Sequence, residues 1–403
     1  MSHAHRRALS LLLSLVLLLL CPLSVHATPS SGEKEVQSPL LPLCQVGDVS
    51  AKSAILMDAD SGQVLYQKNA DERLPMASTT KIMTALCAVE LAGLDKVIRV
   101  DARAVGIEGS SIYLQKGEQL TLLQLLYALL LQSANDAAAA IAIGTAGSIE
   151  AFAGKMNQKA CDLGLENSHF DNPHGLDSEQ HYTTAHDLAL IARAAMANPT
   201  LRAICATRKI TIPGAQEDRV RVLVNHNKLL RTYQGSIGVK TGFTKRSGRC
   251  LVSAAEREGL TLIAVTLSAP DDWNDHTRML DAGFSAYEQV SLCGDEGFET
   301  LLPVMGGREQ YVLVRNAANV SLTLPKERGA LLCTVELPRF AYADVKAGDA
   351  VGRLLFCCDL DGDGEPEKLT EIPLTTTYAV PRRERPSLWK RIGTWLSDLL
   401  RKQ

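Results

Sequence analysis

The sequence has no large excess of charge of either sign. Its 403 residues include 42 lysines and arginines against 45 aspartates and glutamates, which gives a formal net charge of −3. A general nucleic-acid-binding protein needs a basic surplus to displace the counterions of the phosphate backbone, so the composition argues against that class. Hydrophobic residues make up 46% and charged residues 22% of the chain, which excludes a wholly disordered or collagen-like protein.

Beyond its N-terminal leader the sequence lacks any apolar run of the roughly 20 residues that a membrane-spanning helix requires. The leader has Arg6 and Arg7, then an uncharged run over residues 8–20, and it ends in Val-His-Ala at residues 25–27. This pattern is typical of a secretory signal peptide. We therefore expect residues 1–27 to be removed and the mature protein to act outside the cytoplasm, with an uncleaved N-terminal anchor as the alternative.

Metal-binding patterns are also missing. No Cys-X-X-Cys pair occurs, so a zinc site has little support, and we expect neither a metal nor a cofactor. The segment 359–364 superficially resembles a calcium loop, but an EF-hand loop needs Glu at its twelfth position, where Thr370 stands. A solvated hairpin turn is therefore predicted. Nine cysteines follow the leader, and the sequence leaves open whether they are scattered thiols or form one or two disulfides.

The order of secondary-structure patterns predicts two domains. Residues 28–45 are rich in Ser, Pro and Glu and predict a linker. A β-hairpin pattern, then a mostly helical region, then alternating strands predict an α/β domain with a helical insertion over residues 46–290. Short β-prone segments separated by Gly or Pro predict a small all-β domain over residues 297–380.

The segment Ser78-Thr79-Thr80-Lys81 begins the first predicted helix. A separation of three places the Ser78 hydroxyl and the Lys81 amine on one helical face, within reach of each other. Lys81 can take the serine proton only if it is neutral, so burial and a nearby cation would have to lower its pKa by about 2–3 units. Taken alone, this segment is better explained as an ordinary helix cap.

Two further short motifs follow in order. Ser133-Ala134-Asn135 lies between an apolar run and an Ala-rich helix, and Lys240-Thr241-Gly242 begins a predicted strand. A lysine beside a small hydroxyl and a glycine can receive a carboxylate, because Gly242 has no side chain to obstruct it. Each motif alone carries little information, but the three in this order resemble the active-site serine DD-peptidases and β-lactamases.

The surrounding segments narrow this resemblance to the low-molecular-mass D-alanyl-D-alanine carboxypeptidases, the penicillin-binding proteins of peptidase family S11. The segments that carry it are residues 75–81, 170–176, 181–187 and 238–244. The resemblance is strong over residues 46–290 and looser beyond. It implies a β-lactamase/transpeptidase-like α/β domain, with an antiparallel sheet flanked by helices plus a helical subdomain, followed by a small all-β domain.

The resemblance also implies a role for each motif residue. Ser78 would attack the penultimate D-alanine carbonyl of a peptidoglycan stem peptide, with Lys81 as general base. Ser133 would relay the proton to the leaving amine, held polarised by Lys240. Penicillins and other β-lactams would act as covalent inhibitors, because they present a reactive amide and a carboxylate at the same spacing.

The remaining motif residues would bind the substrate. Asn135 would hydrogen-bond the substrate amide, and Thr241 with Lys240 would bind the terminal carboxylate, beside Gly242. Backbone N–H groups of Ser78 and Phe243 would form the oxyanion hole. Some family members have His where this sequence has Phe243, and some have an arginine within the region 271–276, which here has none. No carboxylate-binding arginine is therefore assigned, and substrate preference stays open.

Three alternative functions are weighed. A β-lactamase needs an activated deacylating water, usually from a Glu in an ExxLN-like loop, and residues 165–190 show no clear one. A DD-endopeptidase shares the motifs and is harder to exclude. A non-catalytic wall-binding protein is disfavoured by the intact motifs.

The C-terminal residues 386–403 predict a basic amphipathic helix. Apolar residues recur at steps of three and four, at Leu388, Ile392, Trp395, Leu396 and Leu399. From Arg382 onward seven basic and two acidic residues occur. We expect this helix to lie in the membrane interface, holding the protein peripherally on the outer face of the bacterial cytoplasmic membrane, with docking on its own domain as the alternative.

Overall fold

The computed structural model describes residues 41–216, 219–294 and 296–384, and four single residues near the C-terminus, Ile392, Gly393, Trp395 and Ser397. The predicted signal peptide and most of the predicted C-terminal helix lie outside the described residues. The four single residues have helical backbone geometry, and Trp395 is 62% exposed.

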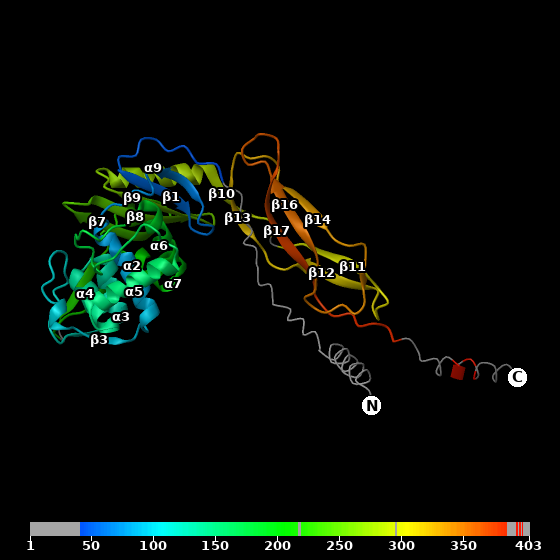
Figure 1. Cartoon of the computed structure of the whole chain (residues 1–403), viewed down its shortest axis with the longest axis horizontal. Helices are drawn as coiled ribbons and strands as arrows, with labels where there is room; N and C mark the ends of the chain where they lie inside the picture. The colour runs from blue at the N-terminus through cyan, green and yellow to red at the C-terminus, as the bar shows by residue number, and fades with distance from the viewer. Residues whose placement is uncertain are drawn as a thin grey trace, which may run out of the picture. The chain divides into compact units, whose positions relative to one another are not determined.

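A five-stranded antiparallel sheet forms the centre of the first domain, in the order β2-β1-β9-β8-β7. Its strands are β1 (Ser53–Asp58), β2 (Val64–Lys68), β7 (Ser236–Thr244), β8 (Gly248–Arg257) and β9 (Leu260–Leu267). Figure 1 shows α9 (Asp272–Ala286) on one side of this sheet and α2 (Lys81–Leu91) and α6 (Ala185–Ala197) on the other. The predicted antiparallel sheet flanked by helices is confirmed.

The central strands are apolar on both faces because helices cover both. In β1, Ala54 and Leu56 join the hydrophobic cluster under α9, whereas Ile55 and Met57 join the cluster under the helical part. This alternation follows from the two-residue period of a strand. Helix α9 approaches closely at Gly283, where an added Cβ would lie 2.6 Å from a Leu262 methyl carbon.

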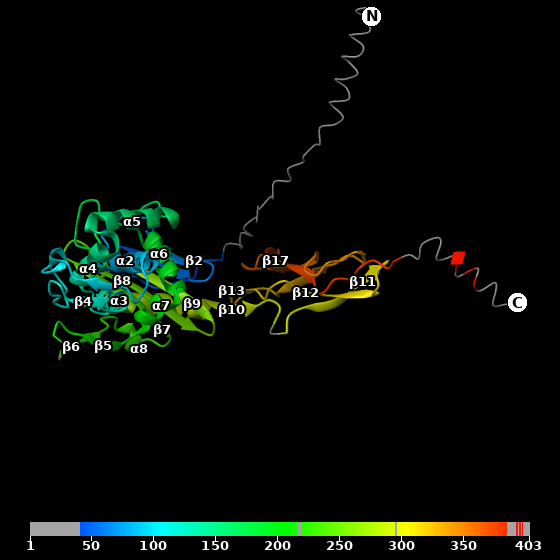
Figure 2. The ribbon, with the colours of Figure 1, turned by 90° about the horizontal axis from the view of Figure 1, so that it is seen from below.

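The helical part is inserted between β2 and β7. Its segments are η1 (Ala77–Thr80), α2, β3 (Val97–Arg99), η2 (Ala102–Ala104), β4 (Gln119–Thr121), α3 (Leu122–Leu131), α4 (Asn135–Ala146), α5 (Ile149–Asp162), α6, α7 (Pro199–Ala206), β5 (Lys209–Pro213), β6 (Val220–Val224) and α8 (Leu229–Thr232). Thr121 and Gln124 form a capping box that starts α3. Helix α5 packs on α4 and α2 at the outer side (Figure 2).

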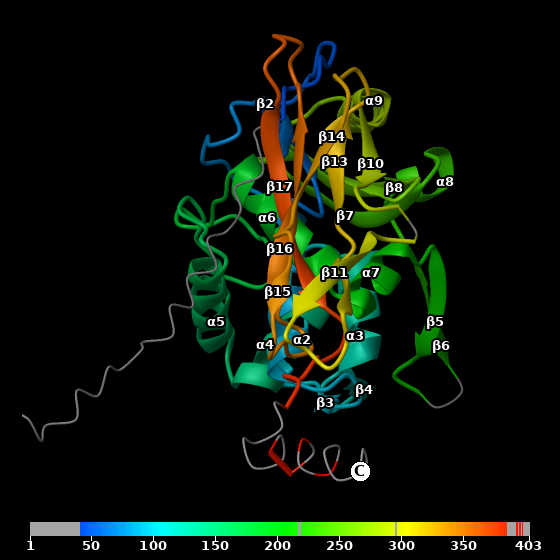
Figure 3. The same ribbon diagram turned by 90° about the vertical axis from the view of Figure 1, so that its right-hand side faces the viewer.

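The C-terminal part is all β, as predicted. A six-stranded sheet has the order β14-β16-β17-β12-β11-β15, and β10 pairs with β13. The bounds are β10 (Tyr287–Ser291), β11 (Glu299–Met305), β12 (Tyr311–Asn316), β13 (Ser321–Pro325), β14 (Leu332–Glu336), β15 (Ala341–Tyr342), β16 (Ala350–Cys358) and β17 (Glu367–Thr376). Figure 3 shows β16 and β17 side by side along this part.

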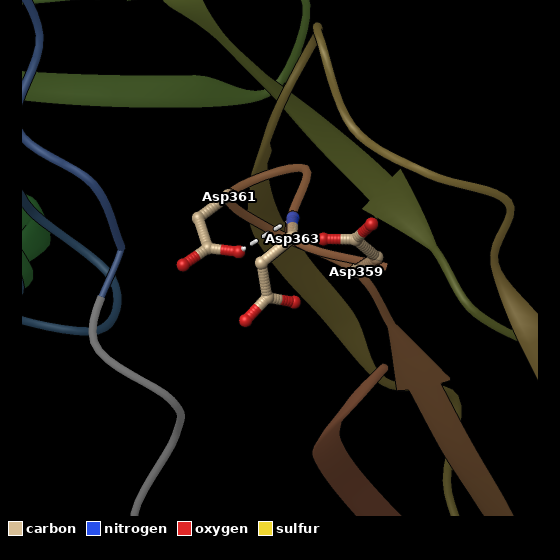
Figure 4. A group of neighbouring side chains, drawn as sticks. All are labelled: Asp359, Asp361 and Asp363. Atoms are coloured by element: carbon tan, nitrogen blue, oxygen red, sulfur yellow. Dashed lines mark hydrogen bonds between the residues drawn. The ribbon is translucent and has the colours of Figure 1, made fainter. Parts of the chain in front are cut away.

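The acidic turn between β16 and β17 brings three carboxylates together. One oxygen from each of Asp359, Asp361 and Asp363 lies within 4.8 Å of the others (Figure 4). The same side chains accept hydrogen bonds from the turn's own backbone, including Gly362 N–H to Asp359 at 2.7 Å and Glu365 N–H to Asp363 at 2.8 Å. These bonds account for the acidic residues as turn formers.

The linker prediction for residues 28–45 is wrong at its C-terminal end. Leu41 and Cys44 are buried against the second hydrophobic cluster, and Cys44 N–H donates to the Leu65 carbonyl at 2.8 Å. The polar composition of the segment as a whole did not indicate that these two residues pack against the domain. All nine cysteines after the leader are free thiols. Within the described ranges, no single helix is long and apolar enough to cross a membrane, although the bent pair α4 and α5 meets the length and composition test together.

Candidate active site

Ser78 and Lys81 lie at the junction of η1 and α2. Ser78 is within η1, Lys81 is the first residue of α2, and Lys81 Nζ is 2.9 Å from Ser78 Oγ. Lys81 is completely buried, whereas Ser78 is partly exposed. The arrangement therefore offers a hydroxyl to a substrate and keeps its partner amine away from water.

The Lys81 amine has two further partners. Its Nζ lies 2.6 Å from Asn135 Oδ1 and 2.5 Å from the His174 backbone oxygen. Burial lowers the Lys81 pKa well below its usual value, the positive charge of Lys240 lowers it further, and Asp136 opposes the shift. A neutral amine donates its two N–H groups to those oxygens, which leaves its lone pair for the Ser78 hydroxyl proton.

Strand β7 brings the Lys240-Thr241-Gly242 motif beside η1. Lys240 is 2% exposed, and its Nζ donates to the Thr241 carbonyl at 2.8 Å. Burial lowers the Lys240 pKa to about 7. At Gly242 an added Cβ would lie 3.1 Å from the Ser78 nitrogen, so a side chain there would push the strand away from the serine. Phe243 follows with a side chain that is 66% exposed.

Ser133 occupies the turn between α3 and α4. It is 5% exposed and has a φ of +58°, in the left-handed region that non-glycine residues adopt only at a cost. In the part of the chain that the structure describes, no hydrogen bond joins Ser133 to Lys81 or Lys240. Asn135 starts α4, and its Nδ2 donates to the Glu108 carbonyl at 2.5 Å.

These residues surround an open cleft of about 390 Å³. Of the predicted site residues, Ser78, Ser133, Thr241, Gly242 and Phe243 line it. The other three predicted residues, Lys81, Asn135 and Lys240, do not line the cleft. They are buried in its wall, behind Ser78, Ser133 and β7. The cleft also receives residues that the motifs did not indicate, namely Ser110, His226, Lys228, Arg249, Asp272 and Trp273.

Arg249 is the notable residue that sequence reasoning missed. It lies on β8 directly opposite Phe243 in the strand register. Its Nη2 and Nε bind Asp272 Oδ1 at 2.7 and 3.0 Å, and its guanidinium lies over the Trp273 ring at 5.8 Å. Arg249 thus lies against residues of the region 271–276, although that segment itself contains no arginine. Only the pairing of β7 with β8 could have indicated this.

The loop after α5 supports the serine from behind. Gly175 has a φ of +87°, and a Cβ there would lie 2.0 Å from the Ala77 carbonyl oxygen. His181 accepts the Asp171 N–H at its Nδ1, and its Nε2 lies 2.8 Å from the Thr80 hydroxyl. Burial lowers the pKa of His181 to about 4 and that of His174 to about 3, so both rings are neutral. Their contacts fix the loop that presents the His174 carbonyl to Lys81.

A serine beside a buried amine, next to a strand that carries a second buried amine, defines a serine hydrolase of the Ser-Lys type. Residues 35–271 match the family model of peptidase family S11, described as D-alanyl-D-alanine carboxypeptidase. The chain belongs to this family, so the predicted family and the predicted serine-type carboxypeptidase activity are confirmed.

Relatives of similar length support this. The D-alanyl-D-alanine carboxypeptidase DacF of Bacillus subtilis is 33% identical over 356 residues, which cover 86% of this chain and 90% of that protein. The Escherichia coli carboxypeptidase DacC is 33% identical over 82% of this chain and 83% of its own length.

Solved structures show the same fold. The carboxypeptidase DacD of Francisella tularensis covers 86% of this chain and 97% of its own, with a TM-score of 0.62 and 26% identity. The Streptomyces K15 DD-transpeptidase is 35% identical, with a TM-score of 0.57, and covers 60% of this chain and 99% of its own. The predicted fold class is thereby confirmed.

Proposed function

We propose that this chain removes the terminal D-alanine from peptidoglycan stem peptides through an acyl-enzyme on Ser78. The observation that carries this proposal is the fully buried Lys81, with its amine 2.9 Å from the Ser78 hydroxyl and its pKa lowered by burial. A neutral amine in contact with a serine hydroxyl is a general base ready to accept its proton.

The acylation step follows from these positions. Lys81 takes the proton of Ser78 as the oxygen forms a bond to the carbonyl carbon of the penultimate D-alanine. The C–N bond then breaks, and the leaving amine of the terminal D-alanine must receive a proton. The resemblance to the family gives this role to Ser133, which lines the same cleft and would relay the proton from Lys81, with Lys240 polarising the Ser133 hydroxyl once substrate is bound. Water later hydrolyses the ester and releases Ser78.

Substrate recognition uses the strand and its neighbour. The close approach of Gly242 to the Ser78 nitrogen supports an oxyanion hole made by the N–H groups of Ser78 and Phe243. Thr241 and Lys240 would receive the terminal carboxylate, and Asn135 the substrate amide. Arg249 lines the same cleft, and its guanidinium would place a positive charge near the substrate carboxylate. The ion pair with Asp272 holds the guanidinium in position. β-Lactams carry a carboxylate and a reactive amide, so they would acylate Ser78 in the same orientation.

The test is a mass measurement on the intact protein and on its products. Penicillin should add its own mass to the peptide that carries Ser78, and Ser78→Ala should remove the adduct from a folded protein. A muropeptide mixture should lose one alanine per pentapeptide. An adduct that persists in Ser78→Ala, or muropeptides that stay unchanged, would contradict the proposal.

A second candidate is DD-endopeptidase action. A D-alanyl-D-alanine endopeptidase of Pseudomonas aeruginosa is 33% identical over 67% of this chain and 86% of its own length. The muropeptide assay separates the two activities, because an endopeptidase would convert cross-linked dimers to monomers.

The cellular placement is a further part of the proposal. Residues 1–27 would be a signal peptide, 46–290 the catalytic domain, 297–380 the small β domain, and 386–403 a helix that holds the enzyme peripherally on the outer face of the cytoplasmic membrane. Support comes from the basic and apolar residues of the C-terminal segment and from the family's substrate, which lies outside that membrane.

A further inference from the structure

The loop of residues 105–118, between η2 and β4, forms one wall of the cleft through Ser110. Its inner side is fastened to the start of α4. The Glu108 carbonyl accepts Asn135 Nδ2 at 2.5 Å, and the Ser110 carbonyl accepts the Asn135 N–H at 2.7 Å. Gly109 lies so close that a Cβ there would be 2.8 Å from Asn135 Nδ2. The position of this loop therefore determines where the Asn135 side chain lies.

Asp136 completes the inner attachment. Its carboxylate is 1% exposed and accepts the Ser111 hydroxyl at 2.6 Å, the Leu114 N–H at 2.9 Å and the Ile112 N–H at 3.2 Å. A buried carboxylate needs such donors, because an unpaired charge in the interior is costly. Asp136 thus ties the loop to the start of α4.

The outer side of the loop is held by one arginine from a different element. Arg221 lies on β6 of the β5–β6 hairpin (green, at the right of Figure 3). Its guanidinium makes a forked ion pair with Glu118, at 2.5 and 3.0 Å, and donates to the carbonyls of Ile112 at 2.8 Å and Tyr113 at 3.3 Å. It also reaches the Pro213 carbonyl on β5 at 3.1 Å. The Arg221 side chain is only 14% exposed and the Glu118 side chain only 5%.

The loop needs this support, since its backbone is strained. Tyr113 has a φ of +58° while its side chain is 83% exposed, so side-chain packing does not hold that conformation. A non-glycine residue in the left-handed region persists when its surroundings impose it. Here two sets of hydrogen bonds impose it. Arg221 donates to the Ile112 and Tyr113 carbonyls from one side of the loop, and Asp136 accepts the Ile112 and Leu114 N–H groups from the other.

We propose that Arg221, paired with Glu118, is a positioning residue for catalysis: it fixes the 105–118 loop from outside and thereby sets the Asn135 oxygen that holds the Lys81 amine. This inference rests on the proposed roles of Ser78 and Lys81. Asn135 Oδ1 lies 2.6 Å from Lys81 Nζ, so the route from Arg221 to the base runs through the loop backbone and one amide side chain. Arg221 itself does not line the cleft.

The route predicts a specific change in the pH dependence of acylation. Besides Asn135, Lys81 faces Lys240 from β7, Asp136 from α4, and the rings of His174 and His181 from the loop after α5. Burial is the largest cause of its lowered pKa. If the loop loosens and water enters, the Lys81 pKa rises, so the neutral amine forms only at higher pH.

The experiment compares four variants of the full mature chain by their rate constant for acylation with a chromogenic β-lactam, measured from pH 6 to 10. Arg221→Lys keeps the charge but loses the fork, and Glu118→Gln keeps every heavy-atom position but loses the charge. Arg193→Lys is the matched control, because Arg193 on α6 also binds two backbone carbonyls, those of Ala59 and Asp60, away from the cleft. Ser78→Ala is the control for the chemistry.

We expect Arg221→Lys and Glu118→Gln to acylate roughly ten- to a hundredfold more slowly, since small displacements of catalytic groups have effects of this size. Their half-maximal pH should move upward, while Arg193→Lys stays within about twofold at an unchanged midpoint. Should Arg221→Lys fail to fold, Glu118→Gln decides the question. Unchanged rates, slower rates without a pH shift, or an equal shift in Arg193→Lys would each overturn the inference. Acylation of Ser78→Ala would instead overturn the proposed function.

Discussion

Replacing Lys240 by Met should stabilise the protein while removing its activity. The lysine is 2% exposed, and burial lowers its pKa from 10.5 to about 7. The folded state therefore binds this proton less well than the unfolded state, and the free energy of unfolding must rise with pH between about 7 and 10.5. Below that window the amine is charged in both states and the full penalty is present; above it the penalty is gone.

The size of the effect follows from the shift. One pKa unit corresponds to about 1.4 kcal/mol, so at pH 7 the buried amine costs on the order of 4 kcal/mol. Methionine has a similar volume and no ionisable group, but it loses the hydrogen bond to the Thr241 carbonyl, worth about 1 kcal/mol. We therefore expect the free energy of unfolding of Lys240→Met at pH 7 to exceed that of the wild type by roughly 3 kcal/mol.

Urea unfolding of both proteins at pH 7 and pH 10 measures this directly. The advantage of Lys240→Met should shrink to near zero at pH 10. The folded-state amine is then neutral, so only about 1 kcal/mol of the penalty remains, and the lost hydrogen bond to the Thr241 carbonyl offsets it. Lys245→Met, at an exposed lysine just after β7, is the matched control and should change little at either pH. An advantage that is absent at pH 7, or equally large at pH 10, would refute the reasoning.

Three further predictions use the same site and the C-terminus. Lys81→Arg should abolish penicillin acylation, because a guanidinium cannot be deprotonated at working pH; near-normal acylation would place the base elsewhere. Arg249→Gln should raise KM for acyl-D-Ala-D-Ala more than it lowers kcat, and should matter little for a substrate amidated at its C-terminus; an equal loss on both substrates would argue against carboxylate binding. A mature chain ending at Pro381 should leave the membrane fraction and keep its activity on small diacyl peptides, as sedimentation and peptide assays would show; retention in the membrane would mean that the anchor lies elsewhere.

Local patterns carried most of what could be predicted. The contact between Ser78 and Lys81 depends on helical spacing alone, so the sequence shows it directly. The apolar runs of β1 and β9 likewise predict strands without knowledge of their partners. The joint order of the three motifs indicated the family, although no physical rule from one motif would have shown that Ser133 and Thr241 line the same cleft.

Contacts that depend on register or on distant loops could not be predicted. Arg249 reaches the cleft because β8 pairs with β7 so that it stands opposite Phe243, and one shift of register would turn it away. Arg221 and Glu118 are separated by 103 residues and belong to a hairpin and a loop with no shared pattern. The buried Leu41 and Cys44 were hidden within a polar segment for a similar reason: their partners are remote in sequence.

The strand order β2-β1-β9-β8-β7 limits how much the cleft can be widened by substitution. β7 is the terminal strand of this sheet, so within the residues that the structure describes one of its backbone edges pairs with no further strand. Such edges recruit strands from other chains and promote aggregation. Here η1 approaches that strand at Gly242, so the walls that shape the cleft also shield it from neighbouring molecules. Substitutions that widen the cleft for bulkier substrates should therefore lower solubility before they lower stability.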